Sequence, residues 1–245
     1  MASRPGGVEK RRALKIDFEN REIQLKVVYY GPALSGKTTN IVALHRRASP
    51  AARGRLMTLD TRDDRTLFFD LLPMRFTSDS GLSFAVKVFT VPGQVIHNAT
   101  RRLVLQGADA VAFVADSQVT ETQNNRESFR DLKENLKENG LDIKSLPLVI
   151  QFNKRDLPGI RTDAEIDALA AKGREPVFKA VATRGEGVME TFFGLLEQTW
   201  HRLDAWHDLE GKFQVDGEEL IDNLRRLLTP PEIDPRGPSA APERP

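Results

Sequence analysis

Apolar residues in the middle of the chain form short continuous runs that alternate with stretches of helical periodicity. The run at 110–115 is apolar throughout, which is typical of a strand buried on both faces of a parallel sheet. Because such strands alternate with helices between residues 21 and 203, we predict an α/β fold with three α/β/α layers and a mainly parallel, six-stranded sheet. The six predicted strands cover residues 23–30, 67–76, 84–91, 110–116, 147–152 and 177–181.

Two pairs of residues mark predicted helix starts. Thr120 with Gln123, and Thr162 with Glu165, have the spacing of a capping box, in which the two side chains satisfy each other's backbone N–H groups. Apolar residues at helical spacing follow the first of these starts and predict a buried face. They are Phe129, Leu132 and Leu136.

The two ends of the chain differ from its middle. We assign a domain to residues 21–203, a flexible basic arm to 1–20, a helical extension to 204–229 and a disordered tail to 230–245, where six of the 14 prolines lie. The apolar stripe that contains Trp206 either folds back on the domain, which we favour, or binds a partner. The extension has two stripes, Trp206, Leu209 and Phe213, then Leu220, Leu224, Leu227 and Leu228.

Composition and charge exclude several kinds of protein. The chain has no cysteine, which removes disulfides, thiol nucleophiles and cysteine metal sites, and its net charge of +1 argues against nucleic acid as a partner. No apolar run approaches the ~20 residues of a transmembrane helix, so we expect a cytoplasmic protein. Residues 1–15 hold five bases against one acid, so this arm is a solvated tail or touches anionic lipid at a membrane surface.

Residues 31–38 match the phosphate-binding pattern G-x-x-x-x-G-K-[ST] between a predicted strand and a predicted helix. In such a loop, backbone N–H groups and the helix N-terminus converge on a polyphosphate, Lys37 neutralises the terminal phosphates and the Thr38 hydroxyl is a Mg²⁺ ligand. The alternative, a glycine turn with only a structural role, fits this setting poorly. The predicted nucleotide-binding residues here are Gly31, Ala33, Leu34, Ser35, Gly36, Lys37, Thr38 and Thr39.

A second pattern, N-K-x-D, follows the predicted strand at 147–152 and selects the base. The carboxylate of Asp156 can accept hydrogen bonds from guanine N1–H and N2–H₂, whereas adenine offers an acceptor at N1 and has no amine at C2. An unpaired carboxylate can reject the wrong base by roughly 10⁴- to 10⁵-fold. Asn153, Lys154 and Asp156 therefore predict a guanine site, although an Asn-Lys turn after a strand is also common in proteins without one.

At these residues the chain resembles the small GTPases of the Ras-like superfamily and, within them, the bacterial MglA-type group. The resemblance covers nearly all of residues 21–203. It is carried by the segments VYYGP (28–32), DRTLFFD (64–70), TVPGQ (90–94), FVADS (113–117) and QFNKRDLP (151–158).

The resemblance implies a role for several residues that the two patterns do not cover. Thr66 would reach Mg²⁺ and the γ-phosphate, and Gly93 would donate its backbone N–H to that phosphate. Gln94 would orient the attacking water, and Arg65 would stabilise the transition state as an internal arginine finger. The backbone N–H of Ala182 would bind the guanine O6 atom.

The chain departs from the common pattern of these GTPases at two positions. Thr90 stands where most relatives carry an aspartate that holds Mg²⁺ through water, and a threonine at this position is characteristic of the MglA-type group. Asp70 is our candidate replacement for the absent aspartate. Ala33 replaces a glycine, and we expect its methyl group to crowd Gln94 or an arginine finger and slow hydrolysis. Arg101 and Arg102, after Gln94, are expected on a solvated helix face that an effector could contact.

The resemblance implies a molecular switch that binds GTP or GDP with Mg²⁺ and hydrolyses GTP slowly without an activating partner. It also implies an MglB-like Roadblock/LC7 GTPase-activating protein, downstream polarity or motility effectors, and a role in bacterial cell polarity or gliding motility at a cell pole. Two alternatives remain open. One is a GTP-binding scaffold with little or no hydrolysis, and the other is a P-loop kinase or ATPase, which the N-K-x-D pattern opposes.

Overall fold

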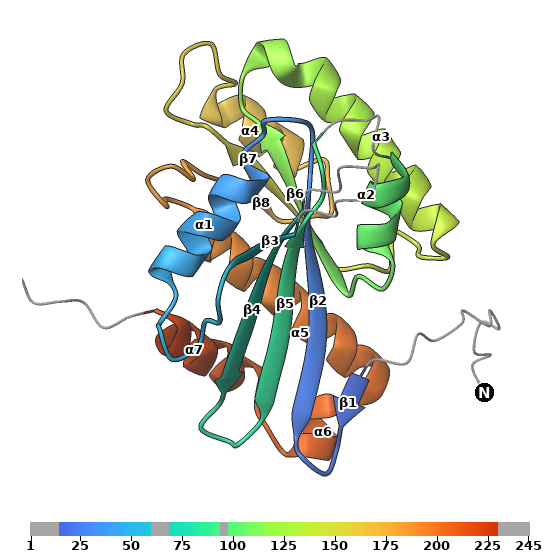
Figure 1. Ribbon diagram of the computed structural model, residues 1–245, viewed down its shortest axis with the longest axis vertical. Coiled ribbons are helices and arrows are strands. Elements are labelled where there is room, and N and C mark those ends of the chain that lie inside the picture. The colour runs from blue at the N-terminus through green and yellow to red at the C-terminus, as the bar shows by residue number, and fades with distance from the viewer. Residues whose placement is uncertain (1–14, 60–68, 94–97, 230–245) are drawn as a thin grey trace, which may run out of the picture.

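The protein is built around a twisted central sheet, which lies between α1 on one side and α2 and α3 on the other in Figure 1. The computed structural model describes residues 15–59, 69–93 and 98–229. Within them the sheet has eight strands in the order β3-β4-β5-β2-β6-β7-β8, with β1 paired to β2. The strands are β1 (Lys15–Asp17), β2 (Glu22–Tyr30), β3 (Met57–Leu59), β4 (Phe69–Thr77), β5 (Ser83–Thr90), β6 (Ala110–Asp116), β7 (Leu148–Asn153) and β8 (Val177–Lys179).

All six predicted strands are present, and their ends differ from the prediction by two residues at most. The sheet is mainly parallel at its centre, where β2 lies between β5 and β6, and antiparallel where β4 joins β5. The predicted number of strands was too low because β1 and β3 are only three residues long. They form by pairing antiparallel with β2 and β4, and runs this short carry no periodicity of their own.

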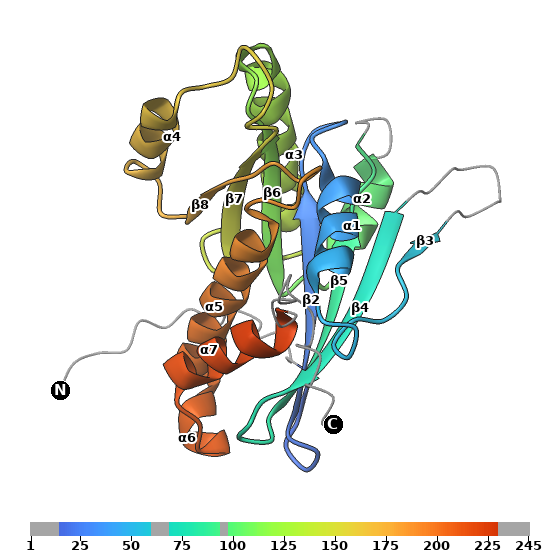
Figure 2. The same ribbon diagram turned by 90° about the vertical axis from the view of Figure 1, so that its left-hand side faces the viewer.

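Helices cover both faces of the sheet, and Figure 2 shows α1, α5 and α7 in front of the strands and α2 and α3 behind them. One apolar cluster joins α1, α5, α6 and α7 to one face, and a second joins α2, α3 and α4 to the other. The predicted three-layer α/β/α architecture is therefore confirmed. The helices are α1 (Lys37–Arg47), α2 (Asn98–Leu105), α3 (Thr122–Glu138), α4 (Asp163–Ala170), α5 (Val188–His207), α6 (Leu209–Phe213) and α7 (Gly217–Leu228), with a 3₁₀ turn at Val119–Glu121.

One of the two predicted capping boxes is confirmed. Thr162 and Glu165 cap α4 reciprocally, the Thr162 hydroxyl accepting the Glu165 N–H and the Glu165 carboxylate accepting the Thr162 N–H. The box predicted at Thr120 was wrong, because the chain already turns as a 3₁₀ helix at Val119–Glu121 and α3 begins without a side-chain cap. A residue inside a helical turn lacks the extended conformation that an N-cap needs.

The C-terminal helices pack into the same core as the rest of the domain. α5 continues to His207, and α6 and α7 then fold back, so that Leu220, Leu224 and Leu228 join the apolar cluster on the α1 face. We had predicted that the stripe containing Trp206 folds back on the domain, but Trp206 itself does not. It is 48 % exposed, with the Arg202 guanidinium 4.8 Å from its ring centre. Within the described residues, no helix is both long and apolar enough to cross a membrane.

Residues near the two ends of the described chain meet each other. The Phe18 ring stacks on that of Phe213 in α6 at 5.5 Å, and Arg21 donates to the Phe213 carbonyl at 2.8 Å. The predicted arm therefore contributes β1 and Phe18 to the folded domain. Its residues 1–14 and the predicted disordered tail at 230–245 lie outside the described residues.

Candidate functional site

The loop between β2 and α1 is held tightly by the strands and loops beside it. A Cβ atom on Gly31 would lie 2.2 Å from the Val114 carbonyl oxygen of β6. Gly36 has a φ of 97°, and a Cβ atom there would lie 2.2 Å from the Asn153 side chain. Both positions of the phosphate-binding pattern therefore require glycine, because neighbouring atoms lie too close to the backbone to leave room for a Cβ atom. The loop leaves Leu34 87 % exposed and ends in the first turn of α1, where Thr38 and Thr39 lie.

Lys37 is a buried cation at the start of α1. Its side chain is 6 % exposed, and Nζ donates to the carbonyls of Gly31 at 3.1 Å and Pro32 at 2.6 Å. Burial, with a smaller contribution from the Arg101 charge, lowers the pKa of Lys37 to about 7. Among the described residues no carboxylate forms an ion pair with it. A buried ammonium group without an acidic partner is suited to a bound anion.

Asp70 joins the phosphate loop to two strands. It is buried at the start of β4, and its carboxylate accepts hydrogen bonds from the hydroxyls of Thr38 at 2.7 Å, Thr58 at 2.9 Å and Thr90 at 3.0 Å. The Asp70 N–H donates to the Thr90 hydroxyl at 2.9 Å. The acid that we suggested as a replacement therefore contacts Thr38, the predicted Mg²⁺ ligand, and Thr90, which stands where most relatives carry an aspartate. Carboxylate and hydroxyl oxygens at one place fit the hard-donor preference of Mg²⁺.

Gly93, which ends the described part of the TVPGQ segment, lies against the phosphate loop. A Cβ atom on Gly93 would be 2.7 Å from the Ala33 Cα and 3.2 Å from the Ala33 Cβ. The methyl group that distinguishes Ala33 from glycine therefore faces the residue that precedes Gln94. Gln94 itself, with Arg65 and Thr66, lies outside the described residues.

Asn153 connects three loops at the carboxyl edge of the sheet. Its amide donates to the Ser35 carbonyl at 2.9 Å, and its side-chain oxygen accepts the Ala182 N–H at 3.0 Å. Lys154, which has a φ of 65°, pairs through Nζ with Asp116 at 2.6 Å. The N-K-x-D segment is in this way fixed against the phosphate loop on one side and the loop after β8 on the other.

The remaining predicted base contacts lie at the same edge. Asp156 is exposed, and its carboxylate has no hydrogen-bond partner among the described residues. The Ala182 N–H is engaged by Asn153, whereas the N–H of Thr183, one residue on, has no acceptor within the described part of the chain. Thr183 is therefore added as a candidate donor that the sequence did not single out.

Asp116 is a further residue that the sequence did not assign to the site. It is buried at the end of β6, pairs with Lys154 and accepts the Gln118 N–H at 3.0 Å. Its neighbour in space is 38 positions away in the sequence, so only the parallel pairing of β6 with β7 brings the two together. The segment FVADS had pointed to this residue without giving it a role.

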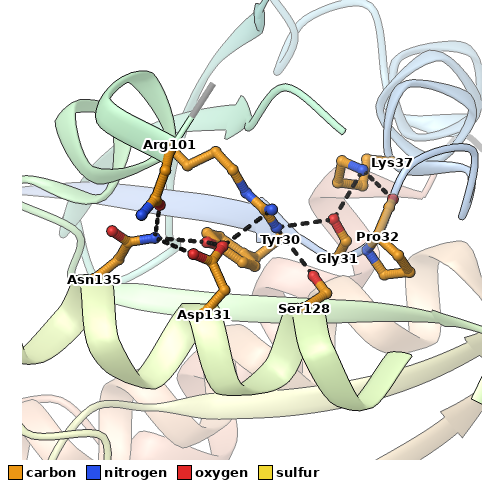
Figure 3. Close-up of polar contacts among 9 residues, drawn as sticks. Tyr30, Gly31, Pro32, Lys37, Arg101, Ser128, Asp131 and Asn135 are labelled. Atoms are coloured by element: carbon orange, nitrogen blue, oxygen red, sulfur yellow. Dashed lines mark hydrogen bonds and ion pairs between the residues drawn. The ribbon is translucent and has the colours of Figure 1, made fainter. Parts of the chain in front are cut away.

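Arg101 contradicts the expectation of a solvated helix face. Its guanidinium is fully buried, whereas the Arg102 side chain is half exposed and pairs with Glu138 at 2.7 Å. The prediction was therefore wrong for Arg101. A signal existed in the sequence, because Arg101 lies three and four positions before Val104 and Leu105 and shares their buried face of α2. Figure 3 shows the guanidinium between α3 and the phosphate loop.

The fold and this edge of the sheet define a class. A phosphate loop after the central strand β2 and an N-K-x-D segment after β7, at the carboxyl edge of a doubly wound sheet, are the features of a small Ras-like GTPase. No family model matches the chain. The "Mutual gliding-motility protein MglA" of Myxococcus xanthus (strain DK1622) is 44 % identical over 176 residues, which is 72 % of this chain and 90 % of that protein. At that identity and coverage, the chain belongs to the MglA-type small GTPases, as its sequence segments had suggested.

Proposed function

We propose that this protein is a molecular switch that binds GTP and GDP with Mg²⁺ and hydrolyses GTP to GDP. The observation that carries the proposal is the arrangement of one sheet edge, where the buried Lys37 ammonium lies in the phosphate loop that Asn153 joins to the base-binding loops. The anion and the base are thereby offered sites on a single connected surface. Membership of the MglA-type small GTPases supports the same activity.

The phosphate loop would bind the polyphosphate through residues 31–39. Its backbone N–H groups and the N-terminus of α1 favour negative charge, and Lys37 adds a full positive charge. Lys37 donates to the carbonyls of Gly31 and Pro32, so a polyphosphate would compete with these two acceptors for the ammonium. A charged acceptor forms the stronger hydrogen bond.

Thr38 and Thr66 would ligate the magnesium ion, with Asp70 beside them. Position 90 holds a threonine where most relatives have an aspartate near the ion. The hydrogen bonds from the Thr38 and Thr90 hydroxyls to the Asp70 carboxylate favour Asp70 as the acid that takes over this role. When bound, Mg²⁺ neutralises charge on the β- and γ-phosphates. The hydrogen bond to Asp70 would also hold the Thr38 side chain in one rotamer, whereas without this partner the side chain could change rotamer.

The guanine base would lie between the N-K-x-D segment and the loop after β8. Asp156, exposed and unpaired within the described residues, would accept the guanine N1–H and N2–H₂ donors. Lys154 would lie beside the base, held by Asp116, and the N–H of Thr183, or of Ala182 after it leaves Asn153, would donate to guanine O6. Selectivity for guanine over adenine would follow from the carboxylate.

Hydrolysis would proceed by in-line attack of water on the γ-phosphate. Gln94 would orient the water, the Gly93 N–H would bind a γ-phosphate oxygen, and Arg65 would stabilise the charge that develops in the transition state. Water forms the new P–O bond, the bond from the γ-phosphorus to the bridging oxygen breaks, and GDP leaves as the other product. The close approach of Ala33 to Gly93 supports a slow rate without an activating partner.

The cellular role we propose follows the name of the relative, which is a gliding-motility protein. The switch would act in bacterial cell polarity or gliding motility, in the cytoplasm and at a cell pole. An MglB-like Roadblock/LC7 dimer would stimulate hydrolysis, and motility effectors would bind the GTP form. The basic residues before Lys15 would add attraction to anionic lipid at the membrane surface.

The test is single-turnover hydrolysis of radiolabelled GTP by the purified full-length protein, with and without a Roadblock/LC7 dimer, and the same assay with radiolabelled ATP in place of GTP. We expect slow basal release of phosphate, stimulation by the dimer of roughly 10³-fold or more, and no reaction with ATP. A preference for ATP would contradict the base assignment and favour a kinase or ATPase.

A second candidate function is a GTP-binding scaffold that scarcely hydrolyses. The observation that favours it is the Ala33 methyl group, which faces Gly93 where a glycine would leave space. Tight GTP binding with neither basal nor stimulated hydrolysis would establish the scaffold instead. Loss of hydrolysis in Gln94→Leu, against measurable turnover in the unmodified protein, would exclude it.

A further inference from the structure

Arg101 in α2 is buried more completely than its charge alone would allow. Its side chain is 0 % exposed, and arginine is almost never fully buried unless it is paired. The pairing residue is Asp131 of α3, whose carboxylate lies 3.0 Å from Nη1. The guanidinium also stacks over the Tyr30 ring, 4.4 Å from its centre. The Asp131 carboxylate and the Tyr30 ring therefore stabilise the positive charge of Arg101 in place of water.

The guanidinium connects α2 to two other parts of the molecule. Nη2 donates to the Ser128 hydroxyl of α3 at 3.0 Å and to the Gly31 carbonyl of the phosphate loop at 3.3 Å, as Figure 3 shows. The same Gly31 carbonyl accepts the Lys37 Nζ at 3.1 Å. One carbonyl oxygen of the phosphate loop thus receives a bond from α2 and a bond from the phosphate-binding lysine.

Asp131 is itself held in place, so that the direction of the guanidinium is determined. The Tyr30 hydroxyl donates to Asp131, and Asn135 donates to the second oxygen of that carboxylate at 3.1 Å. Burial raises the pKa of Tyr30 above its ordinary value, which keeps its hydroxyl a donor at every physiological pH. Asn135 also donates to Asn98, the first residue of α2, at 2.7 Å.

Stability alone is a poor explanation for this arrangement. A buried ion pair gains little over well-packed apolar side chains, because both charges lose their hydration. The Arg101 Nε and Nη1 also have no hydrogen-bond partner among the described residues, although Nη1 lies at ion-pair distance from Asp131, and this is unfavourable for buried donors. The directional contacts are the two hydrogen bonds of Nη2, which join α2 to Ser128 and to the Gly31 carbonyl.

We propose that Arg101 is a positioning residue for GTP hydrolysis, which couples α2 to the phosphate loop through the Gly31 carbonyl. The inference rests on the proposed function. Gly93 lies against Ala33, and Asn98 is bonded to α3. Gly93 and Asn98 are therefore both fixed, the first against the phosphate loop and the second against α3, at the two described ends of the sequence that contains Gln94.

The experiment compares Arg101→Met with Arg102→Met in the full-length protein. Both remove a guanidinium from α2 and replace it with an unbranched side chain of similar length, but the Arg102 side chain is half exposed and pairs only with Glu138 within the described residues. Three quantities are measured: binding of fluorescent GDP, binding of a fluorescent non-hydrolysable GTP analogue, and the first-order hydrolysis rate at saturating GTP. Circular dichroism reports folding.

We expect Arg101→Met to lower the hydrolysis rate about tenfold or more, because a small misplacement of a catalytic group is costly, while GDP affinity changes less than about threefold. Arg101→Lys, which keeps the charge and one donor, should recover part of the rate. Arg102→Met should leave both quantities near those of the unmodified protein. A matched result for Asp131→Asn, with the rate lowered and GDP still bound, would support the same coupling.

An unchanged hydrolysis rate at saturating GTP in folded Arg101→Met would overturn the inference. A lower rate that comes with a matching loss of both affinities and of the melting temperature would also overturn it, because it would show a purely structural role. If Arg101→Met does not fold, Arg101→Lys decides in its place: a rate equal to that of the unmodified protein, with equal affinities, overturns the inference. An unmodified protein that binds neither nucleotide would overturn the proposed function and this inference with it, whereas normal binding with insensitive variants would overturn the inference alone.

Discussion

At the carboxyl edge of the sheet, buried polar side chains join one loop to the next, whereas at the opposite end apolar side chains of α5, α6 and α7 pack on the strands. Asn153 and Asp70 are representative of the first region, with two or more hydrogen bonds each to other segments. Trp200 and Leu224 are representative of the second, packed with Phe84 in one apolar cluster. Figure 1 shows α6 and α7 at the end away from the phosphate loop.

The two ends of the sheet contribute differently to stability and to binding. Apolar packing contributes in proportion to the area removed from water and has no preferred direction, so the α7 end can stabilise the fold without specifying a ligand. Hydrogen bonds to buried groups contribute little net stability but demand particular geometry. Substitutions at the α7 end should therefore change mainly the stability of the fold, whereas substitutions at the carboxyl edge of the sheet should change mainly the nucleotide affinity.

The largest effect on stability is expected from Leu224→Ala in α7. Leu224 is buried against the core, so the free energy of unfolding should fall by about 2–5 kcal/mol, measured by urea unfolding. Leu227, on the same helix but 37 % exposed, is the matched control, and Leu227→Ala should cost less than about 1 kcal/mol. The nucleotide affinity of the folded protein should not change in either variant. Weaker GDP binding by folded Leu224→Ala would show that the two ends are coupled.

The opposite pattern is expected from Lys37→Met at the phosphate loop. Loss of a charged hydrogen-bond donor should weaken GDP binding roughly 10- to 100-fold, measured by fluorescence titration. The ligand-free variant should be at least as stable as the unmodified protein, because methionine avoids the cost of burying an ammonium group. A variant that binds GDP normally but unfolds more easily would reverse the comparison at this end.

Asp70→Ala tests the oxygen cluster between β4 and the phosphate loop. The magnesium concentration needed for half-maximal hydrolysis should rise about tenfold, the scale of effect seen when the partner of a metal ligand is removed. Thr58→Ala removes one of the hydroxyls bonded to Asp70 and should shift the magnesium requirement less. An unchanged magnesium requirement in folded Asp70→Ala would refute the role of this carboxylate.

Ala33→Gly tests the contact between the phosphate loop and Gly93. Removal of the methyl group should speed single-turnover hydrolysis roughly two- to tenfold, because it relieves crowding at Gly93, which precedes the proposed catalytic residue Gln94. The unfolding free energy should fall slightly, since glycine is more flexible in the unfolded chain. Equal hydrolysis rates in the two proteins, with and without an activating partner, would contradict the crowding.

The smallest effect concerns protons. Burial lowers the pKa of Lys37 from 10.5 to about 7 in the ligand-free protein, and a bound polyphosphate favours the charged form. GDP binding at pH 8 should therefore take up a fraction of a proton, and affinity should decline as the pH rises from 7 to 9. Calorimetry in two buffers with different ionisation enthalpies measures this uptake. Lys37→Met is the control, and proton uptake that persists in it would assign the effect to another group.

The same pKa has a consequence for stability with the opposite sign. Between pH 7 and 10.5 the unfolded chain binds the Lys37 proton while the folded, ligand-free protein does not. The contribution of Lys37 to the free energy of unfolding therefore rises with pH across that range and is lost as the pH falls through 7. Urea unfolding of the ligand-free protein at pH 7 and pH 9, compared with Lys37→Met, isolates this contribution.

Much of the fold could be predicted because its signals are local. The buried strands are continuous apolar runs, and the capping box at Thr162 depends on two side chains three positions apart. The same reasoning failed at Thr120, where the backbone had already begun to turn as a 3₁₀ helix. β1 and β3 escaped prediction because each exists only through pairing with a neighbouring strand.

The phosphate loop and the N-K-x-D segment were determined by the sequence itself, because their chemistry is that of consecutive residues and the backbone they build. Strand pairing and helix packing, by contrast, place Arg101 beside Asp131 and Asp116 beside Lys154, and bring the hydroxyls of Thr38, Thr58 and Thr90 to Asp70. These contacts join residues from different strands and helices. Their energies depend on burial and on distances of about 3 Å, which strand pairing and helix packing set and no local pattern records.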